Sequence, residues 1–432
     1  MKLTSWGRYP RIEAEGSHFE TTEQLRRQVV RDGNLIAYGM GRSYGDSALN
    51  ERVVFSRRFN KILHFDPENG LVACECGVSL QELISVFLPR GWFLSVTPGT
   101  RLISVGGAIA SDVHGKNHHV AGCFSSCVDS FELMLPGGEI VLCSREENSR
   151  LFRATCGGMG LTGVILTAVI RLQKVKSAYI RETVKRCRNL EEIFHCFEQY
   201  QKLPYSVAWI DCLESGDQVG RSVLMAGDHA DTGSLDIDLH QPVSVPFDFP
   251  GFCLNRYSVK LFNRFYYHTR PASVEKRLVP LDPFFYPLDS IGHWNRIYGK
   301  GGFTQYQLVL PKSASYEGLK LILNRIAKQG LGSFLAVLKL CGPENGNDLS
   351  FPMEGYSLAL DLKIEKKLFP FLDELDRMVI DYGGRLYLTK DVRMSKAVFR
   401  KGYPQWETFA ELRETMGMKE KFTSLQSRRL EV

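Results

Sequence analysis

The sequence predicts an α+β protein with two domains that meet near residue 176. Residues 1–175 alternate short apolar strands with amphipathic helices, and glycine-rich turns separate them. Residues 303–389 follow the order β-α-β-β-α-β, which is typical of an antiparallel sheet flanked by helices. A chain of 432 residues is long enough for two or three domains, each with its own core.

In the first domain, we expect strands where short apolar runs end at glycine, and helices where a Ser or Thr cap precedes an apolar stripe. Ser79 can cap a helix that Gly91 ends. Pro136-Gly137-Gly138 indicates the turn of a hairpin. The expected elements, in order, are a helix from Thr21 or Thr22 to Gly33, strands 35–38 and 71–76, a helix over 80–90, strands 131–135 and 139–143, and strand 162–172.

The second domain is clear only in its second half. Residues 213–250 are polar and rich in turn residues, so we expect them to be irregular. No internal repeat is recognisable. From residue 303 the periodicity predicts strands 303–310, 333–340, 356–363 and 385–389, with helices over 316–326 and 368–379.

Composition and charge exclude several classes of protein. Lys and Arg number 54 and Asp and Glu 48, and the resulting net charge of +6 is too small to indicate nucleic-acid binding, although it suits an anionic substrate or a lipid surface. No run reaches the ~18 apolar residues of a membrane-spanning helix, and no apolar signal stretch follows Met1. The cysteines are odd in number and scattered, which favours reduced thiols and a cytoplasmic protein.

Two glycine-rich loops in the first domain indicate a cofactor site. Gly39, Gly41 and Gly45 follow strand 35–38, and further glycines lie within 99–115. Backbone without a Cβ lets a phosphate or a flat ring approach closely, and its N–H groups can bind phosphate. The first loop alone could be a plain turn, because no amphipathic helix follows it as a Rossmann motif requires. Together, the two loops predict a cofactor that carries phosphate.

His114 and Lys116 come directly after the second loop, where they could reach the reacting part of a bound cofactor. A loop with solvated polar tips is the alternative. A zinc site formed with Cys123 and Cys127 is a further alternative, but there is no second cysteine pair and the spacing matches no standard zinc site. We therefore expect no metal.

Several polar residues of the second domain could contact a substrate. Gln305 and Gln307 alternate on one strand and therefore face the same side, which Lys339 could share. Lys390 ends the last strand, where a cation could reach a substrate oxygen. A solvated strand end is the alternative for Lys390.

Residues 256–277 combine basic and aromatic side chains and contain one acid, Glu275. Such a pattern can dock on anionic lipid headgroups. An ordinary helix with a basic solvated face is the alternative.

Longer motifs resemble a known family over nearly the whole chain. They include Gly41-Arg-Ser-Tyr-Gly-Asp46, Pro98-Gly-Thr-Arg101, Val105-Gly-Gly-Ala-Ile-Ala110, His114-Gly-Lys-Asn-His-His119, Gly383-Gly-Arg-Leu-Tyr387 and Lys390-Asp391. In type and order these motifs resemble flavoproteins of the vanillyl-alcohol oxidase / p-cresol methylhydroxylase (PCMH) type. Within that family, the resemblance is to oxidases of polyprenylphosphoryl pentoses.

The resemblance implies an FAD-dependent oxidoreductase that oxidises a secondary hydroxyl of such a pentose by hydride transfer to flavin N5. This reaction would be the first half of a ribose-to-arabinose epimerisation for the cell envelope, and a short-chain reductase partner would complete it. The resemblance also implies a peripheral contact with the inner face of the membrane. A soluble aldonolactone or alditol oxidase on the same fold is the alternative function, and a non-catalytic flavin-binding subunit is a further one.

The resemblance also assigns domains and residues. It implies a PCMH-type FAD-binding domain made of residues 1–175 and 384–432, with a substrate domain over 176–383. Arg42 stands where covalently flavinylated relatives carry a histidine, so we expect non-covalent FAD. The residues expected at the reacting centre are Lys390, His114, Gln307, Tyr44, Lys116 and Lys339. Those expected to hold FAD are Ala37, Gly39, Met40, Gly41, Arg42, Ser43, Tyr44, Gly45, Asp46, Ser47, Gly99, Ser104, Val105, Gly106, Gly107, Ser111, Asp112, His114, Ile165 and Tyr387.

Three residues depart from the family pattern. Ser357, Ala359 and Cys341 stand where the related mycobacterial-type sequences carry asparagine, cysteine and phenylalanine. We expect these differences to alter the floor of the substrate pocket.

Overall fold

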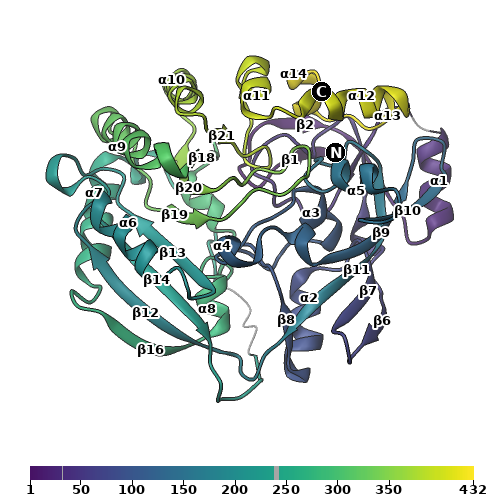
Figure 1. The fold of residues 1–432 in the computed structure, drawn as a ribbon. Coiled ribbons are helices and arrows are strands. Elements are labelled where there is room, and N and C mark those ends of the chain that lie inside the picture. Colours follow the sequence, from purple (N-terminus) through teal and green to yellow (C-terminus); the bar gives the residue numbers. More distant parts are fainter. Residues whose placement is uncertain (32, 238–242) are drawn as a thin grey trace.

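Two lobes lie side by side in the computed structural model, which describes residues 1–31, 33–237 and 243–432 (Figure 1). One lobe holds the N-terminal strands with the C-terminal helices beside them, and the other holds one large sheet covered by helices. Helices and largely antiparallel strands are mixed throughout, which confirms the predicted α+β class.

The first lobe contains a six-stranded antiparallel sheet and a small parallel sheet. The predicted hairpin at Pro136–Gly138 is present, because the two strands beside it pair antiparallel. In spatial order the larger sheet consists of β10 (Ile140–Ser144), β9 (Val128–Met134), β11 (Val164–Lys174), β7 (Leu71–Glu75) and β6 (Ile62–Asp66), with β8 (Trp92–Leu94) on β11. The parallel sheet consists of β3 (Glu15–His18), β5 (Arg52–Phe55) and β4 (Ile36–Tyr38), and β1 (Lys2–Thr4) pairs with β2 (Arg11–Glu13).

Helices of this lobe begin where the sequence offers caps. The Ser79 hydroxyl accepts a hydrogen bond from the backbone N–H of Glu82, whose carboxylate accepts one from the N–H of Ser79, so a full capping box starts α2 as predicted. Thr21 similarly accepts from the N–H of Gln24 at the start of α1. The helices are α1 (Thr22–Arg31), α2 (Leu80–Phe87), α3 (Val105–Ala110), α4 (His118–Ala121) and α5 (Ser149–Thr155).

The second lobe is built on an eight-stranded sheet whose two halves have the same connectivity. The first half runs β12 (Tyr179–Cys187), α6 (Leu190–Gln199), β13 (Tyr205–Ile210), β14 (Ser222–His229), α7 (Arg256–His268) and β16 (Glu275–Pro280). The second half runs β18 (Phe303–Pro311), α9 (Lys312–Gln329), β19 (Ala336–Cys341), β20 (Gly355–Lys363), α10 (Leu368–Asp381) and β21 (Arg385–Leu386). The strand order β16-β12-β14-β13-β19-β20-β18-β21 joins the halves through the antiparallel pair β13–β19.

The structure corrects three expectations for this lobe. The stretch 213–250 is not irregular throughout, since residues 222–229 form the buried strand β14; part of the stretch, 238–242, lies outside the described residues. Strand 333–340 begins only at Ala336, because the Ser333 hydroxyl bonds to both N–H and C=O of Leu335 and forms a turn there. Strand 385–389 ends at Leu386, and the N–H of Lys390 donates to the C=O of Tyr387 in a turn.

The two faces of the large sheet differ. One face packs its leucines against α6, α9 and α10 in a continuous core. The other face points toward the first lobe. Three short elements lie close to α7 in the sequence. Strand β15 (Val243–Ser244) precedes α7, and helix α8 (Leu281–Phe285) and strand β17 (Ile291–Gly292) follow it. Strands β15 and β17 pair in parallel.

The C-terminal helices return to the N-terminal lobe. The fully buried Arg413 donates to the backbone carbonyls of Leu161 and Phe422. The N–H of Leu425 donates to the C=O of Leu49. The helices concerned are α11 (Lys396–Gly402), α12 (Trp406–Thr415), α13 (Met418–Lys421) and α14 (Leu425–Leu430). The domain limits at 175 and 384 stay a prediction.

Among the described residues, no helix is both long and apolar enough to span a bilayer.

Candidate functional site

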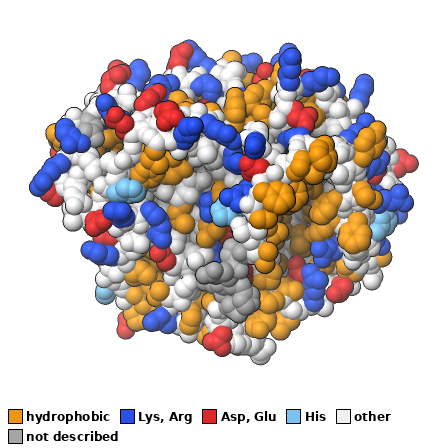
Figure 2. Space-filling view, turned by 180° about the vertical axis from the view of Figure 1, so that it is seen from behind, with side chains coloured by type: hydrophobic (Ala, Val, Ile, Leu, Met, Phe, Trp, Pro, Cys, Tyr) orange, Lys and Arg blue, Asp and Glu red, His pale blue; other side chains and the backbone are white. Residues whose placement is uncertain are grey.

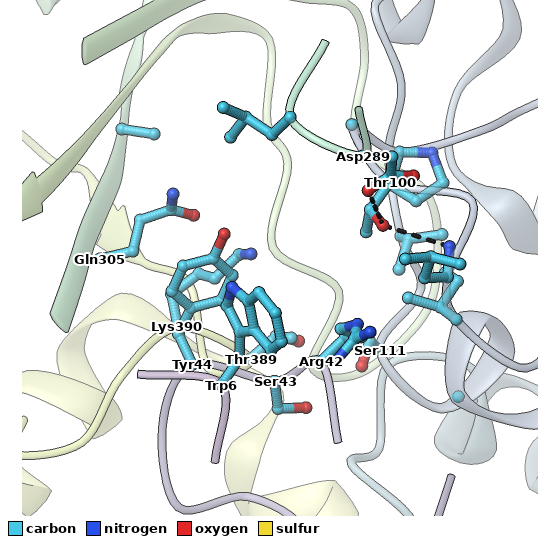
Figure 3. A pocket seen from close by; sticks show the side chains of 18 of the residues that line it. Trp6, Arg42, Ser43, Tyr44, Thr100, Ser111, Asp289, Gln305, Thr389 and Lys390 are labelled. Carbon is cyan, nitrogen blue, oxygen red and sulfur yellow. Dashed lines mark hydrogen bonds between the residues drawn. The ribbon is translucent and has the colours of Figure 1, made fainter. Parts of the chain in front are cut away.

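A cavity of about 920 Å³ lies between the two lobes (Figure 3). The first lobe and the C-terminal segment line it with residues from 37–48, 98–116, 159–165 and 387–390, and the large sheet lines it with the face opposite its helical core. Both glycine loops singled out in the sequence therefore reach one space.

The two loops approach each other so closely that glycine is required. A Cβ on Gly39 would stand 2.5 Å from the hydroxyl oxygen of Ser104, and Gly41 has a φ of +63°. Ser104 is the cap of α3 and accepts from the N–H of Gly107. Within the described residues, the backbone N–H groups of residues 40–43 form no hydrogen bond. Unpaired N–H groups on a glycine loop are the donors that a phosphate needs.

Most residues expected to hold FAD line this cavity, and the exceptions are Gly45, Asp46, Val105 and Asp112. Gly45 packs on the backbone of Asp391, where a Cβ would collide with a carbonyl oxygen. Asp46 forms a buried ion pair with Arg429, and Val105 is fully buried in the core.

Asp112 acts behind the cavity wall. Its carboxylate accepts hydrogen bonds from the Ser125 N–H and from the side chains of Asn345, Asn347 and Ser350. These bonds tie the loop that carries His114 to the loop 343–350 of the other lobe. Asp112 therefore fixes the position of the cradle without facing the cavity.

Two cavity residues, Trp6 of the first lobe and Asp289 of the sheet lobe, were not foreseen. The guanidinium of Arg42 lies 4.1 Å from the ring centroid of Trp6 (Figure 3). Asp289 accepts from the Thr100 hydroxyl at 2.7 Å and from the Arg101 N–H at 2.8 Å, which anchors the second glycine loop to the sheet lobe. Asp289 and Trp6 are isolated in sequence from the motifs, so no pattern marked them.

All six residues expected at the reacting centre line the cavity. Lys390 places its Nζ 3.7 Å from the ring centroid of Tyr44 (Figure 3). Burial lowers the pKa of Lys390, nearby Lys339 lowers it further, and the charge of Asp361 opposes both. A lysine with a lowered pKa can exchange a proton near neutral pH.

Asp361 is a functional candidate that the sequence reasoning missed. It is 1% exposed on β20, and its carboxylate accepts from the Gln305 amide at 2.5 Å. Burial raises the pKa of Asp361 to about 7, while Gln305 and Lys390 act in the opposite direction. A carboxylate among Leu358, Leu360 and Leu362 was the available signal, because a buried acid in an apolar strand needs a polar partner.

Two further lysines face the cavity from opposite walls. Burial lowers the pKa of Lys116 to about 7, with Lys339 adding to the shift and Glu182 opposing it. The Lys116 ammonium donates to the C=O of Phe285 at 3.2 Å. Burial also lowers the pKa of Lys339. Among the described residues, none of Lys116, Lys339 and Lys390, here called the lysine cluster, forms a salt bridge, so the cluster is arranged for an anionic ligand.

His114 and Gln307 connect the cradle to the sheet. The Gln307 amide nitrogen lies 3.1 Å from Nε2 of His114 and 3.2 Å from the Ser357 hydroxyl oxygen, and Nδ1 of His114 has no hydrogen-bond partner among the described residues. Burial, Lys339 and further cations lower the pKa of His114 well below its usual value, which keeps it neutral. Tyr387 packs on this ring and donates from its hydroxyl to the C=O of Ser111.

The departures from the family pattern have different positions. Ser357 lies next to Gln307, and Ala359 lines the cavity, whereas Cys341 is buried behind it. Only Ala359 lines the pocket itself, whereas Ser357 can act on it through Gln307.

The neighbouring histidines and cysteines do not converge. Nδ1 of His118 accepts from the Gly342 N–H, and Nε2 of His119 lies 3.0 Å from the C=O of Leu203. Across the residues that the structure describes, no group of three or more His, Cys, Asp or Glu side chains could share a metal ion.

Beyond the lysine cluster the cavity lining over the first half of the large sheet is mainly apolar, apart from the ion pair of Glu182 with Arg277. We define this apolar branch by Val207, Trp209, Met225, Val279, Phe284 and Phe285, all of which line the cavity. The ring of Trp209 packs at a tilt against that of Tyr266 of α7, with ring centroids 4.7 Å apart. The branch could hold a hydrocarbon chain.

These features fit FAD. The loop 40–43 offers unpaired N–H groups for a pyrophosphate, and glycine backbone at the start of α3 lines the same cavity. The cavity continues to the lysine cluster, where a flat ring would meet a substrate.

Comparisons with known proteins agree with this geometry. A sequence model of an FAD binding domain matches residues 21–144. The chain is 36% identical over 450 residues to the decaprenylphosphoryl-beta-D-ribose oxidase of Mycolicibacterium smegmatis, an alignment that covers 100% of this chain and 97% of that protein. It is 20% identical over 429 residues to the L-gulono-1,4-lactone dehydrogenase of Mycobacterium tuberculosis, covering 96% and 94% of the two chains. A match to the human Delta(24)-sterol reductase, 31% identical over 132 residues, covers 31% of this chain and 25% of that protein.

Proposed function

Because this chain belongs to the FAD-binding oxidoreductase family that includes the decaprenylphosphoryl-beta-D-ribose oxidase, we propose that it oxidises a secondary hydroxyl of a polyprenylphosphoryl pentose. The observation that carries this proposal is the lysine cluster. It faces the glycine cradle without salt-bridge partners among the described residues, at the point where the cavity turns apolar. One site thus offers cations for a phosphate, polar groups for a sugar and an apolar branch for a lipid chain.

The chemistry that bound FAD would supply is an acceptor for the hydride of the carbinol carbon. Backbone from 37–47 and 99–114 would hold its pyrophosphate and ring, with Ile165 and Tyr387 against it. Arg42 stacks on Trp6 and occupies the place of the linking histidine, which supports non-covalent binding.

Lys390 is the residue we assign to the substrate hydroxyl. As the hydride leaves, the hydroxyl proton must be accepted, and negative charge develops on the oxygen. A buried lysine whose pKa is lowered can be neutral and take that proton, and Gln307 can hydrogen-bond the same oxygen. The proton then rests on Lys390 Nζ until solvent removes it.

The remaining polar residues position the substrate. Lys116 and Lys339 would bind the phosphodiester, and the neutral His114 would orient the sugar through its contact with Gln307. Tyr44 supports Lys390 through its ring.

Two further assignments follow from this chemistry. The keto sugar that leaves the site must be reduced at the same carbon to complete an epimerisation, so a reductase partner is expected. A lipid-linked substrate also implies a peripheral contact with the membrane. All cysteines being free supports a reducing compartment and hence the inner face.

The experiment is product analysis with purified holoprotein and a quinone as electron acceptor. With a polyprenylphosphoryl ribose we expect a product lighter by two hydrogens, and reduction of this product with borodeuteride should place one deuterium on the carbon that was oxidised. Failure to form it, despite full FAD content, would contradict the proposed substrate class.

A soluble aldonolactone or alditol oxidase is the second candidate, supported by the full-length similarity to the lactone dehydrogenase. The same assay separates the two. Oxidation of free aldonolactones without detergent, together with none of the polyprenylphosphoryl pentose, would favour this second function.

A further inference from the structure

Helix α7 exposes an apolar stripe to solvent. Tyr257, Leu261 and Phe265 follow one another at a spacing of four residues and are 84%, 71% and 68% exposed. The opposite side of the helix, with Val259, Asn263 and Tyr267, is buried against the sheet. A helix on the surface of a globular protein normally turns its apolar side inward, so a second apolar stripe pointing outward marks a contact surface.

A row of cations runs beside this stripe. Arg256, Lys260 and Arg264 have the same spacing of four, are exposed, and form no salt bridge with any described residue. Phe252, which is 78% exposed, accepts a hydrogen bond from the cap residue Asn255 and so extends the apolar stripe at the start of the helix. We call these residues together the α7 face.

Hydrophobic and basic side chains gather on the half of the molecule that holds the large sheet (Figure 2). Apolar and cationic rows in parallel are complementary to the acyl chains and anionic headgroups of a membrane. A second copy of this chain is a poorer partner for the α7 face than a membrane, because its net charge of +6 would place cations against cations.

A third side of α7, distinct from the buried side and from the exposed apolar stripe, lines the cavity. Phe262 and Tyr266 lie on the flank away from the basic row, and both line the apolar branch. Phe262 is also 42% exposed, so it lies where the branch meets the surface. Ile291, which is 40% exposed, also lines the cavity. One helix thus borders both the outer surface and the lipid end of the site.

We propose that the α7 face docks on an anionic membrane and that a lipid chain passes from the bilayer over Phe262 and Tyr266 into the apolar branch. Docking itself does not depend on the reaction, whereas the passage of the chain rests on the proposed function. Tyr257, Leu261 and Phe265 would insert at the headgroup boundary, and Arg256, Lys260 and Arg264 would bind anionic headgroups.

Co-sedimentation of the FAD-loaded, full-length protein with vesicles tests the docking. We expect binding to vesicles that contain phosphatidylglycerol and much weaker binding to phosphatidylcholine alone. The double variant Lys260→Gln/Arg264→Gln should lower binding to the anionic vesicles at least about tenfold. Leu261→Ser/Phe265→Ser should lower it as well. The matched control is Lys320→Gln/Leu321→Ser, an exposed pair on α9, which should bind as the wild type does.

A second measurement separates this inference from the proposed function. The α7 variants should oxidise substrate embedded in anionic vesicles more slowly, yet oxidise a short-chain, water-soluble analogue at the wild-type rate. Unchanged vesicle binding by both α7 variants would overturn the inference. A wild-type dimer in light scattering that Leu261→Ser/Phe265→Ser dissociates would also overturn it, because the face would then join two copies. Vesicle binding that behaves as expected while no substrate is oxidised would refute the function and leave the docking intact.

Discussion

The two halves of the large sheet share one connectivity but present different chemistry to the cavity. The second half contributes Gln305, Gln307 and Lys339 from β18 and β19. The first half contributes Val207, Trp209 and Met225 from β13 and β14, and its charged lining residues Glu182 and Arg277 neutralise each other in an ion pair. The halves meet at the antiparallel pair β13–β19, so the change from apolar to polar occurs across neighbouring strands. A duplicated scaffold can therefore divide one substrate between a reacting end and a hydrocarbon end.

The largest expected effect comes from the polar half of the site. Lys390→Ala should slow reduction of bound FAD by the substrate about 10²-fold or more, since the acceptor of the hydroxyl proton is lost. Rapid anaerobic mixing measures this rate. The visible spectrum of the resting variant should match the wild type, which controls for cofactor loss. An unchanged rate would remove Lys390 from the mechanism and weaken the contrast between the halves.

Gly39→Ala tests whether the cradle depends on close backbone approach. The added Cβ would meet the Ser104 hydroxyl at 2.5 Å, so this hydroxyl must rotate away from the Gly107 N–H that it caps or the loops must separate. Either change disturbs the cradle, and FAD content should fall severalfold. The ratio of flavin to protein absorbance after purification gives the content. Gly346→Ala, whose Cβ would have its nearest neighbour at 3.9 Å, is the control and should retain FAD. Equal content in both variants would contradict the cradle.

Met225→Glu tests the apolar half. A carboxylate in the apolar branch should raise KM for a long-chain polyprenylphosphoryl pentose about tenfold. The reason is that the hydrocarbon chain of the substrate, when it binds, would remove the water that solvates this carboxylate. KM for a short-chain analogue should be unchanged, since that substrate ends before the branch. Steady-state assays on both substrates make the comparison, and an equal change on both would show that the branch does not hold the chain.

Asp361→Asn gives the smallest and most specific effect. The Asp361 charge raises the pKa of Lys390 against burial, so its removal lowers that pKa further. If the neutral amine accepts the proton, kcat/KM rises as pH rises through the pKa of Lys390. The acid limb of the variant should therefore move to lower pH. If the acid limb of the pH profile stays in place in a variant of normal FAD content, the charge of Asp361 does not act on the pKa of Lys390.

The difference between the two halves of the large sheet also explains which parts of the fold and of the site could be predicted from the sequence. Gly39, Gly41 and the glycines of 99–115 were recognisable because glycine clusters between apolar strands are typical of cofactor loops. Lys116, Lys339 and Lys390 lie beside motifs or at predicted strand positions. Strands β18 to β20 were predicted since their apolar runs are long and clearly bounded.

The first half of the sheet could not be predicted in the same way. Strand β14 ends in Gly227-Asp228-His229, a turn-like composition, yet it pairs on both sides and is buried by its neighbours. The duplicated connectivity leaves no sequence repeat, because packing constrains the apolar pattern and not residue identity. Asp289 and Asp361 were missed because their roles arise from contacts between distant segments.

The central claim is that substrate hydroxyl, lysine cluster and FAD meet in one cavity, and anaerobic titration tests it most directly. Wild-type holoprotein should lose its oxidised flavin absorbance as a polyprenylphosphoryl ribose is added, with one equivalent bleaching one FAD. A preparation with full FAD content whose spectrum does not change with excess substrate would contradict the account.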